Sequence, residues 1–242
     1  MLIGVLGLAG SNFFYYYSIE KTTVATAIIV QYTAPIWVLL YMVARGAQTA
    51  SRRKVLSVAL AILGCAMAIG LLRLGTSAPF VAVSGFKGNP AGVGAALIAA
   101  FTFSFYSVYG QIQVRRYDRW YVVLFAMMGA AALWLIVNPP WKIIAAHYTP
   151  QQWLFLLVFS LVSMLIPLSL YFAGLQYLDA TRAVITACLE PVFAILFAAT
   201  FVGETLGVMQ ILGIVFVLTA TVMVQLPEKG RMLAPTEIAP VD

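Results

Sequence analysis

Charged residues are scarce in this chain. Asp, Glu, Lys and Arg make up only 9% of its 242 residues, whereas hydrophobic residues make up 63%. A typical soluble domain is about 25% charged and about 45–50% apolar. This imbalance excludes an ordinary soluble protein and a disordered chain. The formal charge is +6 at pH 7, but the basic residues are spread between apolar runs and form no continuous binding face, so no nucleic-acid partner is expected.

The chain also has little of what metal sites, disulfides and enzymes need. It has one histidine, His147, and two cysteines, Cys65 and Cys188, which both lie inside apolar runs. Small membrane-buried residues are the simplest interpretation of these cysteines, and we expect no disulfide between them. The sequence has no HExxH pair, GxSxG elbow or Walker loop. We therefore expect no enzyme, no metal or other cofactor, and no ATP-driven pump.

Long apolar runs fill most of the sequence. A transmembrane helix needs about 20 mainly apolar residues, and its backbone groups are paired within the helix, as a lipid environment requires. The runs lack the period-two alternation of a membrane β-barrel strand. We therefore predict an all-α integral membrane protein with eight transmembrane helices, over residues 3–19, 22–44, 54–72, 90–112, 119–138, 152–175, 180–202 and 205–226.

The distribution of lysine and arginine predicts the orientation of these helices. With a cytoplasmic N-terminus, ten Lys and Arg residues fall on the inner side and four on the outer side, which accounts for all 14. Positive charge is enriched in cytoplasmic loops, so both termini and the 45–54 loop are expected in the cytoplasm. The connection between residues 73 and 89, rich in Gly and Pro, is expected outside. The expected location is the plasma or inner membrane, with the lipid bilayer as a partner.

The sequence contains an internal repeat. A shift of 156 residues places Ala34-Pro35 on Glu190-Pro191, and it needs no gap from about residue 13 to residue 70. The second predicted helix then matches the seventh, five spans later, so the two copies cross the membrane in opposite directions. Inverted repeats are typical of secondary transporters, whose substrate site lies near the midplane between the two halves.

This repeat divides the chain into four parts. Residues 1–73 form a truncated first copy with three helices, 74–87 an outer loop, 88–226 a second copy with five helices, and 227–242 a cytoplasmic tail. The first copy is thus two helices shorter than the second, and Met1 is followed almost at once by an apolar run. We expect two further helices upstream of Met1 in a longer protein. The alternative is that a homodimer supplies the missing surface.

Two segments resemble the EamA-type, ten-helix family of the drug/metabolite transporter superfamily. One contains Thr181-Arg182-Ala183, Glu190-Pro191, Gly203-Glu204, Gln210 and Gly213, and the other is its first-half counterpart, Thr23 to Pro35. The resemblance implies a carrier with two inverted five-helix repeats (5+5), a central cavity and both termini inside the cell. The chain departs from that pattern in its eight spans, in Ala34 at the position of Glu190, and in Gln48 at that of Glu204.

Glu190 is the main candidate for a functional residue. It is the only ionisable side chain near the middle of a predicted span, and an acidic group there costs roughly 2.5–3.5 kcal/mol on insertion scales. A cost of this size favours a position at a cavity, as a site for a substrate ammonium group or a proton. The alternative is a packed, protonated carboxyl group that hydrogen-bonds to the backbone.

Two prolines point to the same place. Pro191 follows Glu190, and Pro35 holds the matching position of the first copy. Proline lacks the N–H that a helix interior needs and kinks the helix, so each frees a carbonyl group at membrane depth. Paired kinks in inverted halves predict the substrate cavity between them, whereas kinks of purely structural value are the alternative.

Six polar or aromatic residues are predicted to line this cavity together with Glu190. They are Gln31, Tyr32, Thr186, Tyr171, Tyr15 and Tyr106. Gln31 precedes Pro35 by one turn, as Thr186 precedes Glu190, so each pair shares a helix face. The tyrosines would add aromatic walls with a polar tip. For each of the six, helix packing is the alternative role.

These features together predict a secondary transporter that works by alternating access through a central cavity. The family resemblance implies that it moves small metabolites, amino-acid-like compounds or drugs. Its partners are then a small-molecule solute and, in a coupled version, protons. The competing hypothesis is a membrane protein that does not transport, either an assembly subunit or a truncated remnant of such a carrier.

Overall fold

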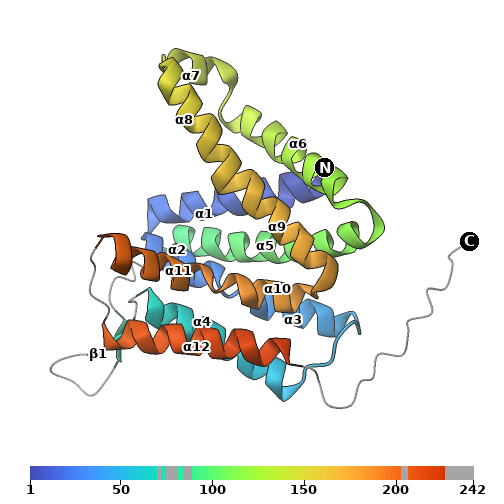
Figure 1. Cartoon of the computed structure of the whole chain (residues 1–242), viewed down its shortest axis with the longest axis vertical. Helices are drawn as coiled ribbons and strands as arrows, with labels where there is room; N and C mark the ends of the chain where they lie inside the picture. Colours follow the sequence, from blue (N-terminus) through green and yellow to red (C-terminus); the bar gives the residue numbers. More distant parts are fainter. Residues whose placement is uncertain (70–71, 75–80, 84–88, 203–206, 227–242) are drawn as a thin grey trace, which may run out of the picture.

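The computed structural model describes residues 1–69, 72–74, 81–83, 89–202 and 207–226, and these are mostly helical (Figure 1). In the first part, a π-helical stretch η1 (Ile3–Ala9) continues as α1 (Gly10–Lys21), followed by α2 (Val24–Gln31), α3 (Ala34–Ala44) and α4 (Arg52–Ala68). The second part contains α5 (Pro90–Arg116), α6 (Arg119–Val137), α7 (Pro140–Ala145), α8 (Pro150–Ser160), η2 (Leu161–Leu165), α9 (Ile166–Tyr177), α10 (Ala180–Ala187), α11 (Glu190–Phe197), η3 (Ala198–Val202) and α12 (Val208–Gln225).

Capping side chains fix where many of these helices begin. An oxygen of the residue before the helix accepts a hydrogen bond from a backbone N–H in the first turn of α2, α4, α5, α6, α8 and α10. Such caps satisfy donors that have no partner inside the helix. Proline occupies the first position of α5, α7 and α8, where its missing N–H is of no consequence.

Six helical stretches of the described residues are long and apolar enough to cross a membrane, namely Thr26–Ala44, Pro90–Arg116, Arg119–Val137, Pro150–Tyr177, Ala180–Phe201 and Val208–Gln225. They correspond to six of the eight predicted spans. The other two predicted spans, the first and the third, contain η1–α1 and the 17-residue α4. These two helices are not among the six, so the count of eight transmembrane helices stays a prediction.

One element departs from the all-helical expectation. The connection after α4, which was expected to be an outer loop, contains a short antiparallel pair of strands, β1 (Leu72–Leu74) and β2 (Val81–Val83). Leu72 pairs with Val83, and Leu74 with Val81. Alternating and β-branched residues of this kind suit a strand, and the run is too short to form a stable helix. Gly203 and Glu204 of the sequence motif lie outside the described residues.

The helices pack into a bundle from which one pair projects. α4 lies along α12, and α5 runs beside η1–α1, α2 and α3. The hairpin of α6, α7 and α8 extends beyond the remaining helices (Figure 1). Of the most apolar 18-residue stretch within Pro150–Tyr177, only 6% is buried inside the molecule.

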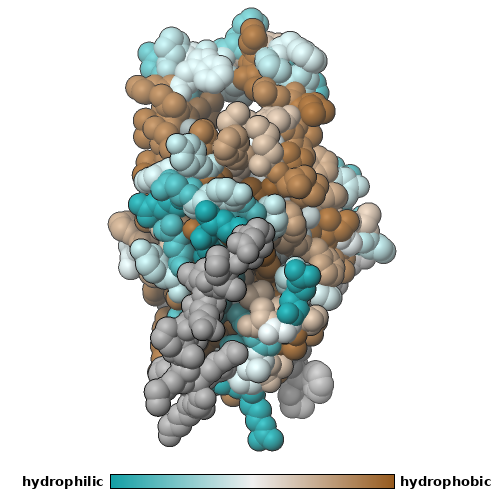
Figure 2. Space-filling view, turned by 90° about the vertical axis from the view of Figure 1, so that its right-hand side faces the viewer, coloured by the Kyte–Doolittle hydropathy of each residue, from teal (hydrophilic) through white to brown (hydrophobic). Residues whose placement is uncertain are grey.

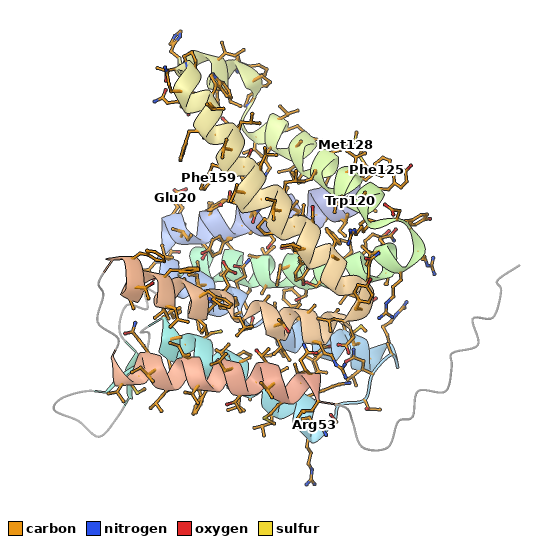
Figure 3. The ribbon with its side chains drawn as sticks, in the orientation of Figure 1. Glu20, Arg53, Trp120, Phe125, Met128 and Phe159 are labelled. Carbon is orange, nitrogen blue, oxygen red and sulfur yellow. The ribbon has the colours of Figure 1, made fainter. Side chains whose placement is uncertain are left out.

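Large apolar side chains cover the outer faces of the bundle. Phe125, Met128 and Phe159 point away from the helix axes on α6 and α8 (Figure 3), and each is about half exposed. An apolar surface of this extent does not occur on monomeric soluble proteins, but it suits lipid. Trp120 and Trp153 are exposed near the first residues of α6 and α8, as expected for anchors at a membrane interface. The structure therefore describes a multi-pass membrane protein.

Candidate functional site

Two helical stretches are interrupted at matching positions of the repeat. α2 ends at Gln31 and α3 begins at Ala34, while α10 ends at Ala187 and α11 begins at Glu190. The two-residue turns between them, 32–33 and 188–189, are 156 residues apart, which is the offset of the sequence repeat. A proline stands at the second position after each turn, where a helix has no intrahelical partner for an N–H. Both interruptions thus have the same local cause.

Glu190 and Tyr32 meet between these two turns. Tyr32 lies in the turn of the first half, and its hydroxyl donates a hydrogen bond to Glu190 Oε2 at 3.3 Å. Glu190 is the first residue of α11, directly after the second turn, and it is exposed. The contact therefore joins the two halves of the repeat and leaves part of the carboxylate accessible.

A cavity of about 510 Å³ opens beside this pair. Of the seven residues predicted to line a cavity, six do so here: Glu190, Gln31, Tyr32, Tyr171, Tyr15 and Tyr106. These residues come from positions far apart in the chain, on α1, α2, α5, α9 and α11 and in the turn after α2. Other lining residues were not anticipated, and the polar ones are Ser11, Asn12, Tyr16 and Ser163. In the sequence each of them is only a polar residue within an apolar run, and this pattern occurs at too many positions to single them out.

Stacked aromatic rings form one wall of the cavity. The Tyr106 and Tyr171 rings stack with centroids 5.5 Å apart, and Phe103 stacks on Tyr106 at 5.9 Å. The Tyr171 hydroxyl is hydrogen-bonded to Ser107 Oγ at 2.8 Å. Tyr106 is only 4% exposed, so this wall is buried and mostly apolar, and the Tyr171 ring is held by the hydrogen bond at its hydroxyl.

Gln31 is held by a chain of hydrogen bonds. Its Nε2 donates to Ser11 Oγ at 3.2 Å, and Ser11 Oγ donates to the Ala99 carbonyl at 3.3 Å. The three residues come from α2, α1 and α5. These hydrogen bonds hold the Gln31 amide at the cavity wall and join α2 to α1 and α5.

Backbone carbonyls near the interrupted turns find partners on adjacent helices. Ser104 Oγ on α5 donates to the Ala34 carbonyl at 3.2 Å. Cys65 Sγ on α4 contacts the Cys188 carbonyl at 3.8 Å as a weak donor. Both cysteines are free and buried. Irregular backbone at membrane depth is tolerated where neighbours satisfy its polar groups in this way.

Thr186 is the predicted site residue that does not line the cavity. Its hydroxyl donates to the Arg182 carbonyl at 2.8 Å and accepts from Gln225 Nε2 at 3.1 Å. It therefore faces α12. Helical spacing placed it on a shared face with Glu190, but the turn at 188–189 separates α10 from α11 and breaks that helical register.

The electrostatics of the cavity are one-sided. Among the described lining residues, Glu190 carries the one formal charge, and it is acidic. No group of three or more His, Cys, Asp or Glu side chains that could hold a metal is found in the described part of the chain. The lining can therefore offer a cationic group one carboxylate, several hydroxyls and the faces of aromatic rings.

Two other hollows lie away from the interrupted helices. One, of about 440 Å³, is an apolar groove between α3 and α5 that is lined by Trp37 and Phe101 among others. The second, of about 740 Å³, lies near the start of η1 and the α5–α6 turn, and Arg116 and Tyr117 help to line it. Neither contains any of the predicted site residues, so the cavity at Glu190 is the candidate site.

Interrupted membrane helices around a cavity are typical of membrane transporters. The chain belongs to the EamA-like transporter family, whose sequence profile matches residues 1–70 and 90–226. This family points to a transporter and not to an enzyme.

Individual relatives agree with this assignment. The chain is similar to an uncharacterized transporter of Archaeoglobus fulgidus, with 24% identity over 214 residues, which are 86% of this chain and 71% of that protein. It is also similar to one solved crystal structure, described only as that of a protein, with a TM-score of 0.70 and 19% identity over 93% of this chain and 74% of the other. At this identity the structural likeness shows a common fold alone.

Proposed function

We propose that the protein is a secondary transporter that moves a small solute through the cavity at Glu190 by alternating access. The observation that supports this most directly is the hydrogen bond between Tyr32 and Glu190, which joins the two interrupted helices at the cavity. In transporters of inverted-repeat architecture, interrupted helices near the midplane form the substrate site, and the halves rock around it. The solute is a small metabolite, an amino-acid-like compound or a drug.

The membrane arrangement that goes with this function is eight spans with an inverted repeat. Residues 1–73 contribute three helices and 88–226 contribute five, and the two parts are copies of one repeat with opposite orientations in the membrane. The matching interruptions, 156 residues apart, support the repeat. The chain then has both termini in the cytoplasm and crosses the cell membrane with Glu190 near the midplane.

The charge of the cavity indicates what the site binds. A carboxylate at membrane depth is costly unless water or a cation reaches it, and Glu190 is exposed to the cavity. Tyrosine rings beside a carboxylate add attraction for a cation. We therefore assign Glu190 to a positively charged group of the solute or to a transported proton.

The test is transport by purified protein in sealed proteoliposomes. A panel of radiolabelled amines, amino acids and neutral metabolites is offered, and counterflow is compared with that of protein-free vesicles. At least one cationic or zwitterionic solute should accumulate, and an excess of the same unlabelled solute outside should compete. If no compound of any charge moves while the reconstituted protein remains folded, the carrier proposal fails, and a membrane protein without transport activity becomes the better account.

Removing the Tyr32 hydroxyl should weaken transport without harming the fold. In Tyr32→Phe the ring stays, but Glu190 loses a hydrogen bond that fixes its carboxylate. A hydrogen bond to a charged group is worth about 1.5 kcal/mol or more, so we expect about a tenfold loss of initial uptake rate. Tyr121→Phe is the matched control, because Tyr121 is 63% exposed on α6. Equal rates for both variants would remove Tyr32 from the site.

Epitope tags should report opposite sides for two described loops. Gly46 lies in the α3–α4 connection and His147 in the α7–α8 connection, and both are exposed. The charge distribution places the first in the cytoplasm and the second outside. A tag at Gly46 should bind antibody only after cells are permeabilised, whereas a tag at His147 should bind it on intact cells. Labelling of both tags from one side would contradict the proposed arrangement.

A further inference from the structure

Gln111 holds the turn between α9 and α10 from both sides. Its Nε2 donates to the Leu178 carbonyl at 3.0 Å, and its Oε1 accepts from the Ala180 backbone N–H at 3.3 Å. The Gln111 side chain projects from α5 and is only 5% exposed. One amide thus satisfies a donor and an acceptor of the same turn, which ties the start of α10 to α5.

Two more glutamines reach α10 from other elements. Gln48, in the α3–α4 connection, accepts from Thr181 Oγ1 at 3.1 Å. Gln225, at the end of α12, donates to Thr186 Oγ1 at 3.1 Å. Together with Gln111, these side chains bind the first two turns of α10 to three different parts of the bundle. We refer to Gln48, Gln111 and Gln225 as the glutamine latch.

The latch lies at one end of the bundle, where the α3–α4, α5–α6 and α9–α10 connections meet (Figure 1). Figure 2 faces this end and shows hydrophilic residues gathered on it. The helices that the latch joins carry fully buried side chains: Phe172 and Leu175 on α9 pack in a cluster with Tyr106, and Ile185 on α10 packs in a second cluster with Cys188. Buried side chains therefore pack around α9 and α10 beside the latch.

The bonds made by α5 divide along its length. Toward its N-terminus, its backbone and Ser104 bond to α1 and α3 through Ser11 and Ala34. Toward its C-terminus, Ser107 bonds to Tyr171, and Gln111 bonds to the α9–α10 turn. The second set thus ties α9 and α10 to α5, whereas the first set ties α5 to α1 and α3. Water can replace amide hydrogen bonds as the end opens, so the net cost of breaking them is small.

We infer that the glutamine latch is the gate on this side of the transporter, and that its three side chains set how much of the protein is open there. This inference rests on the proposed alternating-access function. When this end opens, the bond between Gln48 and Thr181, which joins residues 1–73 to residues 88–226, must break, and the bonds of Gln111 and Gln225 hold α10 in the position that makes it. Weakening them should therefore favour the state that is open at this end.

The experiment measures a distance across the latch end in the reconstituted chain, with no solute present. Spin labels are placed at Tyr177 on α9 and Arg52 on α4, both exposed, after Cys65 and Cys188 are replaced by alanine. Pulsed electron resonance then gives the distance distribution. Gln111→Met keeps the size of the side chain and removes both bonds, and we expect the longer-distance population to rise about tenfold relative to the shorter one. Thr181→Val, which loses the bond to Gln48, should give a smaller shift in the same direction.

The matched control is Gln113→Met on the same helix. The Gln113 side chain makes no hydrogen bond within the described part of the chain, so its distribution should equal that of the parent. The latch is refuted if Gln111→Met and Thr181→Val leave the distribution unchanged, or if Gln113→Met shifts it equally. The distance measurement does not depend on transport, so a latch-dependent shift in a chain that moves no solute in the proteoliposome assay would refute the carrier and leave the latch as a structural tie between helices. Transport with an unshifted distribution would refute the latch alone.

Discussion

Glu190→Gln should reduce transport of a cationic solute by about 10- to 100-fold, which makes it the most damaging single change in the cavity. Glutamine keeps the shape of the side chain and can still accept from the Tyr32 hydroxyl. It removes the one formal charge among the described lining residues. Loss of a charge-assisted hydrogen bond corresponds to roughly 1.5–3 kcal/mol, and an equal loss in the transport rate constant gives this factor. Initial uptake rates in proteoliposomes measure it.

A matched control is available at Glu20, on the last turn of α1 (Figure 3). Glu20 pairs with Lys21 at 2.7 Å at the surface, and this hydrogen bond raises the pKa of Lys21 above its ordinary value. Glu20→Gln removes the same charge outside the cavity and should leave uptake unchanged. Equal losses in both variants would show that net charge, and not the site, matters.

The pH dependence of uptake separates the two roles of Glu190. If a proton is carried on this carboxylate, the parent protein should respond to a pH gradient, and Glu190→Gln should not, because an amide does not exchange a proton in this range. If the carboxylate only binds a cationic solute, the variant loses rate at every pH. Unchanged uptake together with unchanged pH dependence would exclude both roles.

Sequence patterns predicted the position of the cavity because prolines and the repeat act on the backbone. Pro35 and Pro191 lack the N–H that would continue the preceding helix, so each stands in the first turn after an interruption, and the two positions are 156 residues apart. The pairing of Tyr32 with Glu190 follows from this geometry. Such features are readable from one sequence, because each has a local cause.

Which face of a helix points inward was much harder to predict. In soluble helices a polar face marks the outside, but in lipid both faces are apolar, and this contrast is lost. Thr186 was therefore placed on the wrong side, and Ser11 and Ser107 were overlooked, although both bond at or near the cavity wall. Gln111 was missed for the same reason, since its partners are backbone groups of a turn 67 residues away.

The contact between α4 and α12 leads to a second prediction of large effect. The two helices approach most closely at Gly64 and Gly213, where a Cβ atom on either glycine would lie within 3 Å of the other helix. The repeat relates Gly64 to Ala220 and Gly213 to Ser57, and both of these partners are fully buried. Small residues at both ends of the contact allow the backbones to touch, which is how membrane helices associate without a hydrophobic driving force.

Gly213→Ala should therefore destabilise the protein, although alanine is the better helix former. Its Cβ would meet Ala68 N at 2.5 Å and Gly64 O at 2.7 Å, and these are backbone atoms that cannot turn aside. Overpacking costs about 1–3 kcal/mol, which corresponds to a fall in Tm of about 2–12 °C for a chain of this size. With Cys188 replaced by alanine, reaction of the buried Cys65 thiol on α4 with a maleimide during heating reports separation of the pair.

Gly174→Ala gives the matched comparison, because nothing lies within 4 Å of the Cβ that it would add on α9. This variant should hold or raise the Tm, since alanine exceeds glycine in helix propensity by about 1 kcal/mol. Gly64→Ala should behave like Gly213→Ala, and the double variant should lose less than the two single losses together, because both changes force the same helices apart. A Gly213→Ala protein as stable as Gly174→Ala would mean that α4 and α12 are not in backbone contact in the membrane. The contact of Cys65 on α4 with the turn at Cys188, next to Glu190, would then need a different explanation.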